Sequence, residues 1–286
     1  MTLDALVGRV VGPAAFCVEA GQVADFVRAT GDDAGRWRGF APPGFAAAAL
    51  FAVAPALLAD PEVGRYGRSL LHAEQAFTWR RALAVGEVLE VRGRVAAVRA
   101  RGTLHIVSFE VETDGPEGTW MEGVSSFMLS DKPAVASEEE EEPAVDEQGP
   151  CDPAGPIPLP AVGEPLPPLR RSASRFDLER YAAAGGDRNP IHWDHDAARA
   201  AGLPGVVAHG LLVAAWLFQA AARHRAGPDP LRRARVRFRR PLRPAAAGVI
   251  SGRVASSGAP GTTLELALEG GAGRPPFATA VVEVTP

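Results

Sequence analysis

The sequence predicts an α+β protein made of two copies of one unit, in which an antiparallel sheet wraps around a long apolar helix. Two stretches, 45–58 and 210–222, are apolar on almost every side, which is typical of helices buried in a core. Each is followed by several runs rich in β-branched residues and separated by glycine-containing turns. The two halves also resemble each other in sequence, which indicates a duplicated fold.

The internal repeat is visible at three places along the chain. Gly31-Asp32 matches Gly186-Asp187 at an offset of 155 residues, and Gly44 matches Gly210 at an offset of 166. The second copy therefore carries eleven more residues before its long helix. Further on, the segment Trp-Arg-Arg-Ala-Leu from Trp79 matches Phe-Arg-Arg-Pro-Leu from Phe238.

The elements follow the same order in both halves. We expect a short helix at 23–32 and 176–186, then the long helix at 45–58 and 210–222. The strands that follow are expected at 89–99, 103–113 and 119–129 in the first half and at 249–257, 262–269 and 277–284 in the second. A sheet buries such a helix only by curling around it, and two sheets side by side remove an exposed edge from each. This architecture is a tandem (double) hotdog fold.

An acidic, proline-rich segment separates the halves. We predict an N-terminal domain at 1–130, a linker at 131–168 that is mobile over much of its length, and a C-terminal domain at 169–286. The linker holds ten acidic residues and one basic one, so the rest of the chain, with 29 basic and 24 acidic residues, carries a formal charge of +5 against −4 for the whole. A charge of that size suits an anionic ligand or acidic partner and is too small to indicate nucleic acid.

Composition also limits the cellular setting. Cys17 and Cys151 lie far apart without a Cys-x-x-Cys motif, so neither a disulfide framework nor a zinc site is indicated. The N-terminus has no basic leader, and the apolar run 45–58 is too short to span a bilayer. We therefore expect a cytoplasmic protein that is not inserted in a membrane.

The polar cluster before the second long helix points to chemistry. Asp187, Asn189, Pro190 and His192 fall within six residues, and Gly210 follows His192 by eighteen. This pattern resembles the signature of the MaoC-like (R)-specific enoyl-thioester hydratases and dehydratases. The resemblance covers both halves, and the first half is similar to the degenerate N-terminal domain of double-hotdog members.

The resemblance implies an activity and the residues that carry it. These enzymes add water to trans-2-enoyl thioesters, or remove it from (R)-3-hydroxyacyl thioesters, on CoA or acyl-carrier protein and without a cofactor. His192 and Asp187 would polarise one water, Asn189 would orient them, and the Gly210 N–H at the helix N-terminus would hold the thioester oxygen. The first half keeps Asp32 and Gly44 but has Trp37 in place of the histidine, so we expect it to be non-catalytic.

Other residues receive supporting roles or a plainer interpretation. We expect His209 to pack behind the site and Ala48 and Ala49 to wall an apolar tunnel for the acyl chain, whereas Phe218 stands where some members carry a small polar residue. Arg237 and Arg239 belong to an arginine-rich alternating strand in which Val236 and Phe238 face inward. These arginines either meet the phosphates of the carrier or form a solvated strand face.

Each motif residue also has a structural interpretation. Asp187 alone is an ordinary turn residue and His192 alone an ordinary core imidazole; their combination with the Gly210 spacing favours catalysis. A metal site at His192, Asp194, His195 and Asp196 is a weaker alternative, because neighbouring residues on one turn point in different directions.

Three functions compete. The first is the hydratase or dehydratase, the second a non-catalytic acyl-thioester-binding or scaffold subunit of a dehydratase heteromer, and the third thioester hydrolysis on the same fold. The acid–base residues speak against the second function, and the dehydratase-type motif speaks against the third. A homodimer of double hotdogs is left open.

Overall fold

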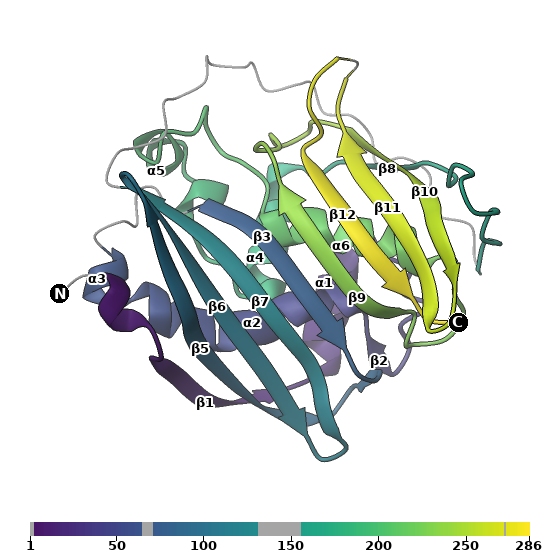
Figure 1. The fold of residues 1–286 in the computed structure, drawn as a ribbon, viewed down its shortest axis with the longest axis horizontal. Helices are drawn as coiled ribbons and strands as arrows, with labels where there is room; N and C mark the ends of the chain where they lie inside the picture. The colour runs from purple at the N-terminus through teal and green to yellow at the C-terminus, as the bar shows by residue number, and fades with distance from the viewer. Residues whose placement is uncertain (1–2, 65–70, 131–155, 272) are drawn as a thin grey trace.

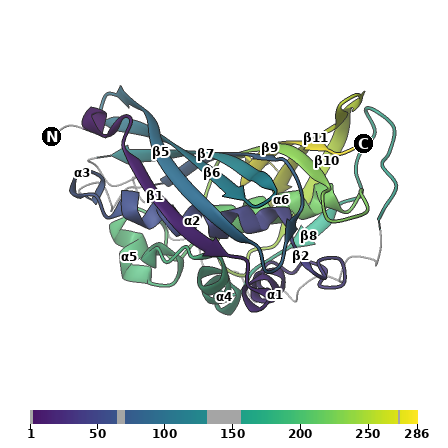
Figure 2. The ribbon, with the colours of Figure 1, turned by 90° about the horizontal axis from the view of Figure 1, so that it is seen from below.

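The computed structural model describes residues 3–64, 71–130, 156–271 and 273–286. One curved sheet forms a continuous layer, and the two long helices lie against its concave face (Figures 1 and 2). Helices α1 (Ala20–Ala29), α4 (Arg175–Gly185) and α5 (His195–Ala200) form a further layer beyond them, on the side away from the sheet (Figure 2). The double hotdog predicted from the sequence is confirmed.

The main sheet has ten strands in the order β1-β5-β6-β7-β3-β9-β12-β11-β10-β8. Every pair is antiparallel, and the five strands on each side of the β3–β9 seam correspond in order to those of the other half. The first-half strands are β1 (Val10–Cys17), β3 (Leu71–Trp79), β5 (Val88–Arg101), β6 (Leu104–Gly115) and β7 (Gly118–Ser130). The second-half strands are β8 (Leu169–Arg171), β9 (Leu231–Phe238), β10 (Gly248–Gly258), β11 (Gly261–Glu269) and β12 (Ala278–Val284). Two short strands, β2 (Phe40–Ala41) and β4 (Leu83–Ala84), pair separately.

The seam joins the halves through backbone pairing. Glu74 of β3 lies opposite Arg237 of β9, and Thr78 lies opposite Arg233. Each half thereby covers one edge of the other half's sheet, which removes two exposed edges. The expected pairing of the two sheets is confirmed.

The helices are α1 (Ala20–Ala29), α2 (Ala46–Leu58), α3 (Pro61–Gly64), α4 (Arg175–Gly185), α5 (His195–Ala200) and α6 (Gly210–Ala222). Helix α6 has the predicted bounds, and every one of its residues after Gly210 is buried. The N-terminus of α2 lies directly against α6, because a Cβ added at Gly44 would come within 2.9 Å of the Ala215 Cβ. Only glycine allows this approach. None of the helices in the described part has the length and apolarity needed to cross a membrane.

The predicted linker is described only at its C-terminal end, since residues 131–155 lie outside the described residues. Residues 156–168 pack against the second half: Leu166 is buried, and its N–H donates to the Gly252 carbonyl at 2.8 Å. The Gly163 N–H donates to the Val254 carbonyl in the same way. The division into domains at 1–130 and 169–286 remains our proposal.

Candidate active site

The loop that carries the motif is fixed at the end of α4. Ser174 and Asp177 form a reciprocal capping box that starts this helix. Gly186 ends it in a left-handed conformation, with φ of 83°, that a side chain would strain. The chain then turns sharply, so that Asp187 lines a cavity next to α6.

His192 is held in one orientation by a short turn. The Asn189 side chain accepts from the Ile191 N–H at 3.4 Å and starts a 3-10 turn that ends at His192. The His192 Nδ1 lies 2.8 Å from the Val207 carbonyl oxygen, which can only accept, so Nδ1 carries the proton and donates. The Nε2 atom therefore presents a lone pair to the cavity side, toward Asp187.

Asp187 and His192 form a close but not directly bonded pair. Their Oδ2 and Nε2 atoms are 3.7 Å apart, beyond hydrogen-bond distance. Burial raises the pKa of Asp187, against the lowering effects of His192 and the Asn189 N–H, which donates to Oδ1 at 3.2 Å. Burial lowers the pKa of His192, although Asp187 opposes this. Burial thus moves the pKa of Asp187 up and that of His192 down, and their closeness makes the two groups titrate as a coupled pair.

His209 lies behind the pair and touches both members. Its ring stacks on that of His192 with centroids 3.7 Å apart and planes 27° apart, and its Nε2 lies 3.3 Å from the Asp187 carbonyl oxygen, to which it donates. Complete burial lowers the pKa of His209 far below its ordinary value, so the ring is neutral. His209 is outside the cavity lining, so the structure places it as a packing residue rather than as a substrate contact.

The cavity beside the pair has a volume of about 210 Å³ and lies at the junction of the halves. Asp187, Asn189, His192 and Gly210 all line it, so the structure brings the four predicted catalytic residues together. Gly210 is the first residue of α6, where backbone N–H groups lack intrahelical acceptors and the helix dipole favours negative charge.

The two arginines expected at the site have different positions. Arg239 lines the cavity, whereas Arg237 points to the opposite face of the sheet and pairs with Glu74 across the seam at 2.9 Å. Arg237 is therefore not among the residues that line this cavity. Its strand alternates as predicted, with Val236 buried and Arg235 and Arg237 exposed, and that alternation turns Arg237 outward.

The acyl tunnel predicted at Ala48 and Ala49 also needs correction. Both residues are buried in the core and neither lines the cavity. Helix α2 does contribute to the cavity wall, but through Phe51, Ala54 and Leu58, which lie on one face of the helix. The spacing of three and four residues between them is the pattern in the sequence that marks this face of the helix. His72 of β3 also lines the cavity, and no motif in the sequence marks it.

The corresponding place in the first half is filled. Asp32, Trp37, Gly44 and Phe218 surround a space of only about 10 Å³. Phe218 lies on this first-half space and packs edge-on against Trp79, with ring centroids 5.3 Å apart. It does not line the second-half cavity. The absence of a histidine at this point thus coincides with the loss of the cavity.

A metal site at Asp194, His195 and Asp196 has no support in the geometry. Asp194 is exposed and caps α5, accepting from the Asp196 and Ala197 N–H groups. Among the described residues, the one cluster of metal-ligand side chains is Asp187, His192 and His209, with ligand atoms within 4.8 Å of one another. One nitrogen of each ring, the His192 Nδ1 and the His209 Nε2, already donates to a backbone carbonyl oxygen, that of Val207 and that of Asp187.

Comparisons with known proteins agree with this geometry. Residues 160–258 match the model of the MaoC like domain, and residues 5–119 match that of the FAS1-like dehydratase domain region. The 3-hydroxyacyl-thioester dehydratase X of Mycobacterium tuberculosis is 34% identical over 187 residues, which are 63% of this chain and 58% of that protein. The aligned part is thus less than two thirds of the relative.

Solved structures extend the likeness over nearly the whole chain. The crystal structure of HtdX from Mycobacterium tuberculosis superposes with a TM-score of 0.66 at 25% identity, covering 96% of this chain and 99% of that one. A MaoC-like dehydratase superposes with a TM-score of 0.79 at 21% identity and covers 99% of both chains. The chain thus combines a stretch that matches the MaoC like domain, residues 160–258, with one that matches the FAS1-like dehydratase domain region, residues 5–119, in a double-hotdog fold.

Proposed function

We propose that this chain catalyses the reversible hydration of trans-2-enoyl thioesters, which in reverse is the dehydration of (R)-3-hydroxyacyl thioesters. The observation that carries the proposal is the 3.7 Å gap between the Asp187 Oδ2 and the His192 Nε2 inside a cavity at a helix N-terminus. This gap is too long for one hydrogen bond and suits one water that contacts both groups. The (R) configuration rests on the family likeness.

The reaction follows from what each group can do. The Asp187 carboxylate and the His192 Nε2 lone pair each accept a hydrogen bond from the water, and the pair takes up one proton as the water oxygen attacks C3 of the enoyl group; the other hydrogen stays on the new hydroxyl. Negative charge then grows on the thioester oxygen, and the Gly210 N–H is placed to donate to it. The proton taken from the water returns to C2, so the pair ends in its starting state.

The carrier of the acyl group is CoA or acyl-carrier protein, which share a phosphopantetheine arm. Arg239 lines the cavity and is the predicted arginine in position to meet a phosphate. The small cavity volume favours short acyl groups, because about 210 Å³ is below the usual range for drug-sized ligands.

The test is the loss of the enoyl chromophore when purified protein acts on crotonyl-CoA, trans-2-octenoyl-CoA and crotonyl-carrier protein. His192→Gln and Asp187→Asn should each lower kcat by roughly 10²–10⁴-fold. The matched control is Asp194→Asn, which changes an exposed acid of the same loop and keeps a residue that can cap α5.

Retention of most of kcat in either active-site variant would contradict the proposal. The competing function, a non-catalytic acyl-thioester-binding subunit, predicts that the wild-type protein binds these thioesters and turns over none of them. The same assays, with binding measured by calorimetry, separate the two functions.

A further inference from the structure

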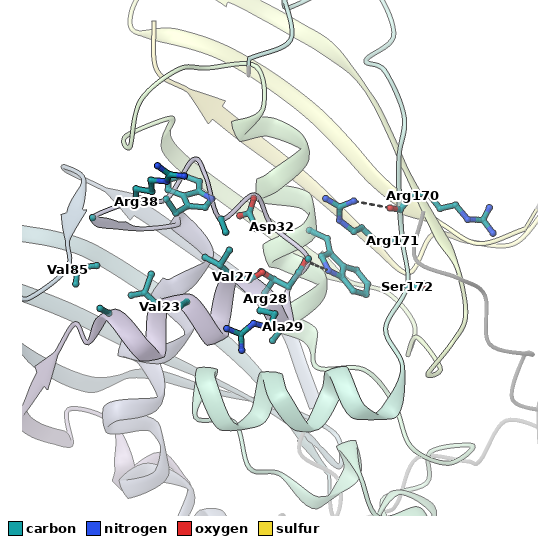
Figure 3. A pocket seen from close by; sticks show the side chains of 18 residues that line it. Val23, Val27, Arg28, Ala29, Asp32, Arg38, Val85, Arg170, Arg171 and Ser172 are labelled. Atoms are coloured by element: carbon teal, nitrogen blue, oxygen red, sulfur yellow. Dashed lines mark hydrogen bonds between the residues drawn. The ribbon is translucent and has the colours of Figure 1, made fainter. Parts of the chain in front are cut away.

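A second and larger cavity lies on the outer side of the first half. Its volume is about 610 Å³, and its lining comes from α1, the loop that follows it at 30–39, strand β8 and Trp216 of α6 (Figure 3). It shares no lining residue with the cavity of the proposed active site. Its size is within the range of small-molecule sites in proteins.

The charge of this outer cavity is strongly unbalanced. Four arginines line it, Arg28, Arg38, Arg170 and Arg171, against one acidic residue, Asp32. The Arg171 side chain extends from β8 toward the side where Asp32 lies (Figure 3). Arg28 also pairs with Asp25, but both side chains are more than 60% exposed, so solvent screens this pair. The lining therefore favours an anion.

These arginines do not come from the repeat. Phe16 of β1 pairs with Leu89, and Arg171 of β8 pairs with Gly248 at the equivalent place in the second half, so Arg171 stands where the first half has a phenylalanine. At the offset of 155, Arg28 and Arg38 correspond to Ala183 and Trp193. The positive charge is thus a local feature of this cavity.

The floor of the cavity is held firmly by α6. The Trp216 Nε1–H and the Gln219 Nε2–H both donate to the Thr30 carbonyl oxygen, at 3.1 and 3.0 Å. The Gln219 Oε1 in turn accepts from the Arg171 Nε–H at 3.0 Å. The loop and the inner arginine are therefore positioned before any ligand arrives, which lowers the entropic cost of binding.

The remaining wall is apolar. Val23 and Val27 of α1 and Val85 form one side, and Ala20 and Ala24 leave room beside them. We propose that the outer cavity binds a small amphipathic anion, a carboxylate or phosphate monoester whose apolar body lies along α1 and whose negative charge is attracted by the arginines of the lining. This site is separate from the proposed hydration, and its test needs no enzymatic activity.

The test uses two dyes with the same ring skeleton on the full chain. 8-Anilinonaphthalene-1-sulfonate carries a sulfonate, and N-phenyl-1-naphthylamine lacks it; binding of each is followed by fluorescence, with stoichiometry from calorimetry. The double variant Arg28→Gln/Arg38→Gln should lower the affinity for the sulfonate dye by at least about tenfold and leave the affinity for the neutral dye unchanged. Ala24→Trp, which fills the cavity, should weaken both.

The matched control is Arg99→Gln/Arg101→Gln, which removes two exposed charges from β5 outside the cavity lining. Equal affinity of the wild type and all variants for the sulfonate dye would overturn the proposal. An equal loss for both dyes in Arg28→Gln/Arg38→Gln would also overturn it, because the charge would then play no part.

Competition with the sulfonate dye separates the two sources of the anion. Displacement by decanoate identifies an acyl carboxylate, and displacement by adenosine monophosphate identifies a phosphate monoester. Displacement by neither would overturn the assignment of an amphipathic anion.

Discussion

Replacing Asp32 by Asn should stabilise the folded protein at neutral pH. Burial raises the pKa of Asp32 from 3.8 to about 6, even though the Asp33 N–H, the Trp37 indole and Arg36 and Arg171 all lower it. The ionised carboxylate is therefore less stable in the folded chain than in the unfolded one. Asn keeps the shape of the side chain and removes the charge.

The size of the effect follows from that shift. Each pKa unit corresponds to about 1.4 kcal/mol, so a shift of about two units costs the folded state up to about 3 kcal/mol once Asp32 is ionised. Between pH 3.8 and about 6 the folded state binds more protons than the unfolded state, so this cost grows as pH rises through the window and is fully present above it. Because Asp32 keeps some exposure, we expect a gain of roughly 1–3 kcal/mol at pH 7.5 and almost none at pH 4.

The measurement is urea-induced unfolding of the wild type and Asp32→Asn at pH 7.5 and pH 4. Asp33→Asn, at the exposed neighbouring position, is the matched control and should change the free energy of unfolding by less than about 0.5 kcal/mol at either pH. A difference between Asp32→Asn and wild type that is the same at both pH values would refute the reasoning, because the charge of Asp32 would then not be its cause.

Three more predictions concern the active site. Phe51→Ala should enlarge the cavity and lower KM for trans-2-octenoyl-CoA more than for crotonyl-CoA, by up to about 0.8 kcal/mol for each newly buried methylene; equal changes for both substrates would contradict this. His209→Phe, which keeps a ring on His192 but loses the donor to the Asp187 carbonyl, should lower kcat with little change in KM, and an unchanged kcat would remove His209 from a positioning role. kcat/KM should fall as pH falls, because protonation of the coupled Asp187–His192 pair removes its proton-accepting groups, and Asp187→Asn should move or abolish this acid limb; an acid limb unchanged in that variant would contradict the assignment.

Local patterns in the sequence predicted the elements well. Helix α6 has the predicted bounds, strands β5 and β7 extend the predicted runs at both ends by one or two residues, and β6 starts one residue after its predicted run and ends two residues after it. Apolar periodicity and turn glycines are properties of short segments, so one sequence contains them. The grouping of Asp187, His192 and Gly210 in one cavity was predictable for a different reason. Their order and spacing in the sequence resemble the signature of the MaoC-like enzymes.

Long-range contacts explain the residues that were misplaced. The partner of Arg237 is Glu74, which is more than 160 residues away and reaches it only because β3 and β9 pair at the seam. The face of α2 that lines the cavity depends on how this helix lies against the second half, and its small residues Ala48 and Ala49 face the core instead. Phe218 belongs to the second half but lines a space in the first, a place that the local pattern around it does not contain.

Helix α6 makes the two halves unequal. Its first residue, Gly210, lines the proposed active site, whereas Phe218, two turns later, occupies the corresponding space in the first half. Close contact between Gly44 and Ala215 keeps that space closed at the start of α2. Trp37 borders this closed space and also lines the outer cavity, so a histidine introduced by Trp37→His would lie away from the cavity of the proposed active site. Helix α6 thus starts at the cavity of the proposed active site and contributes Phe218 to the closed space of the first half.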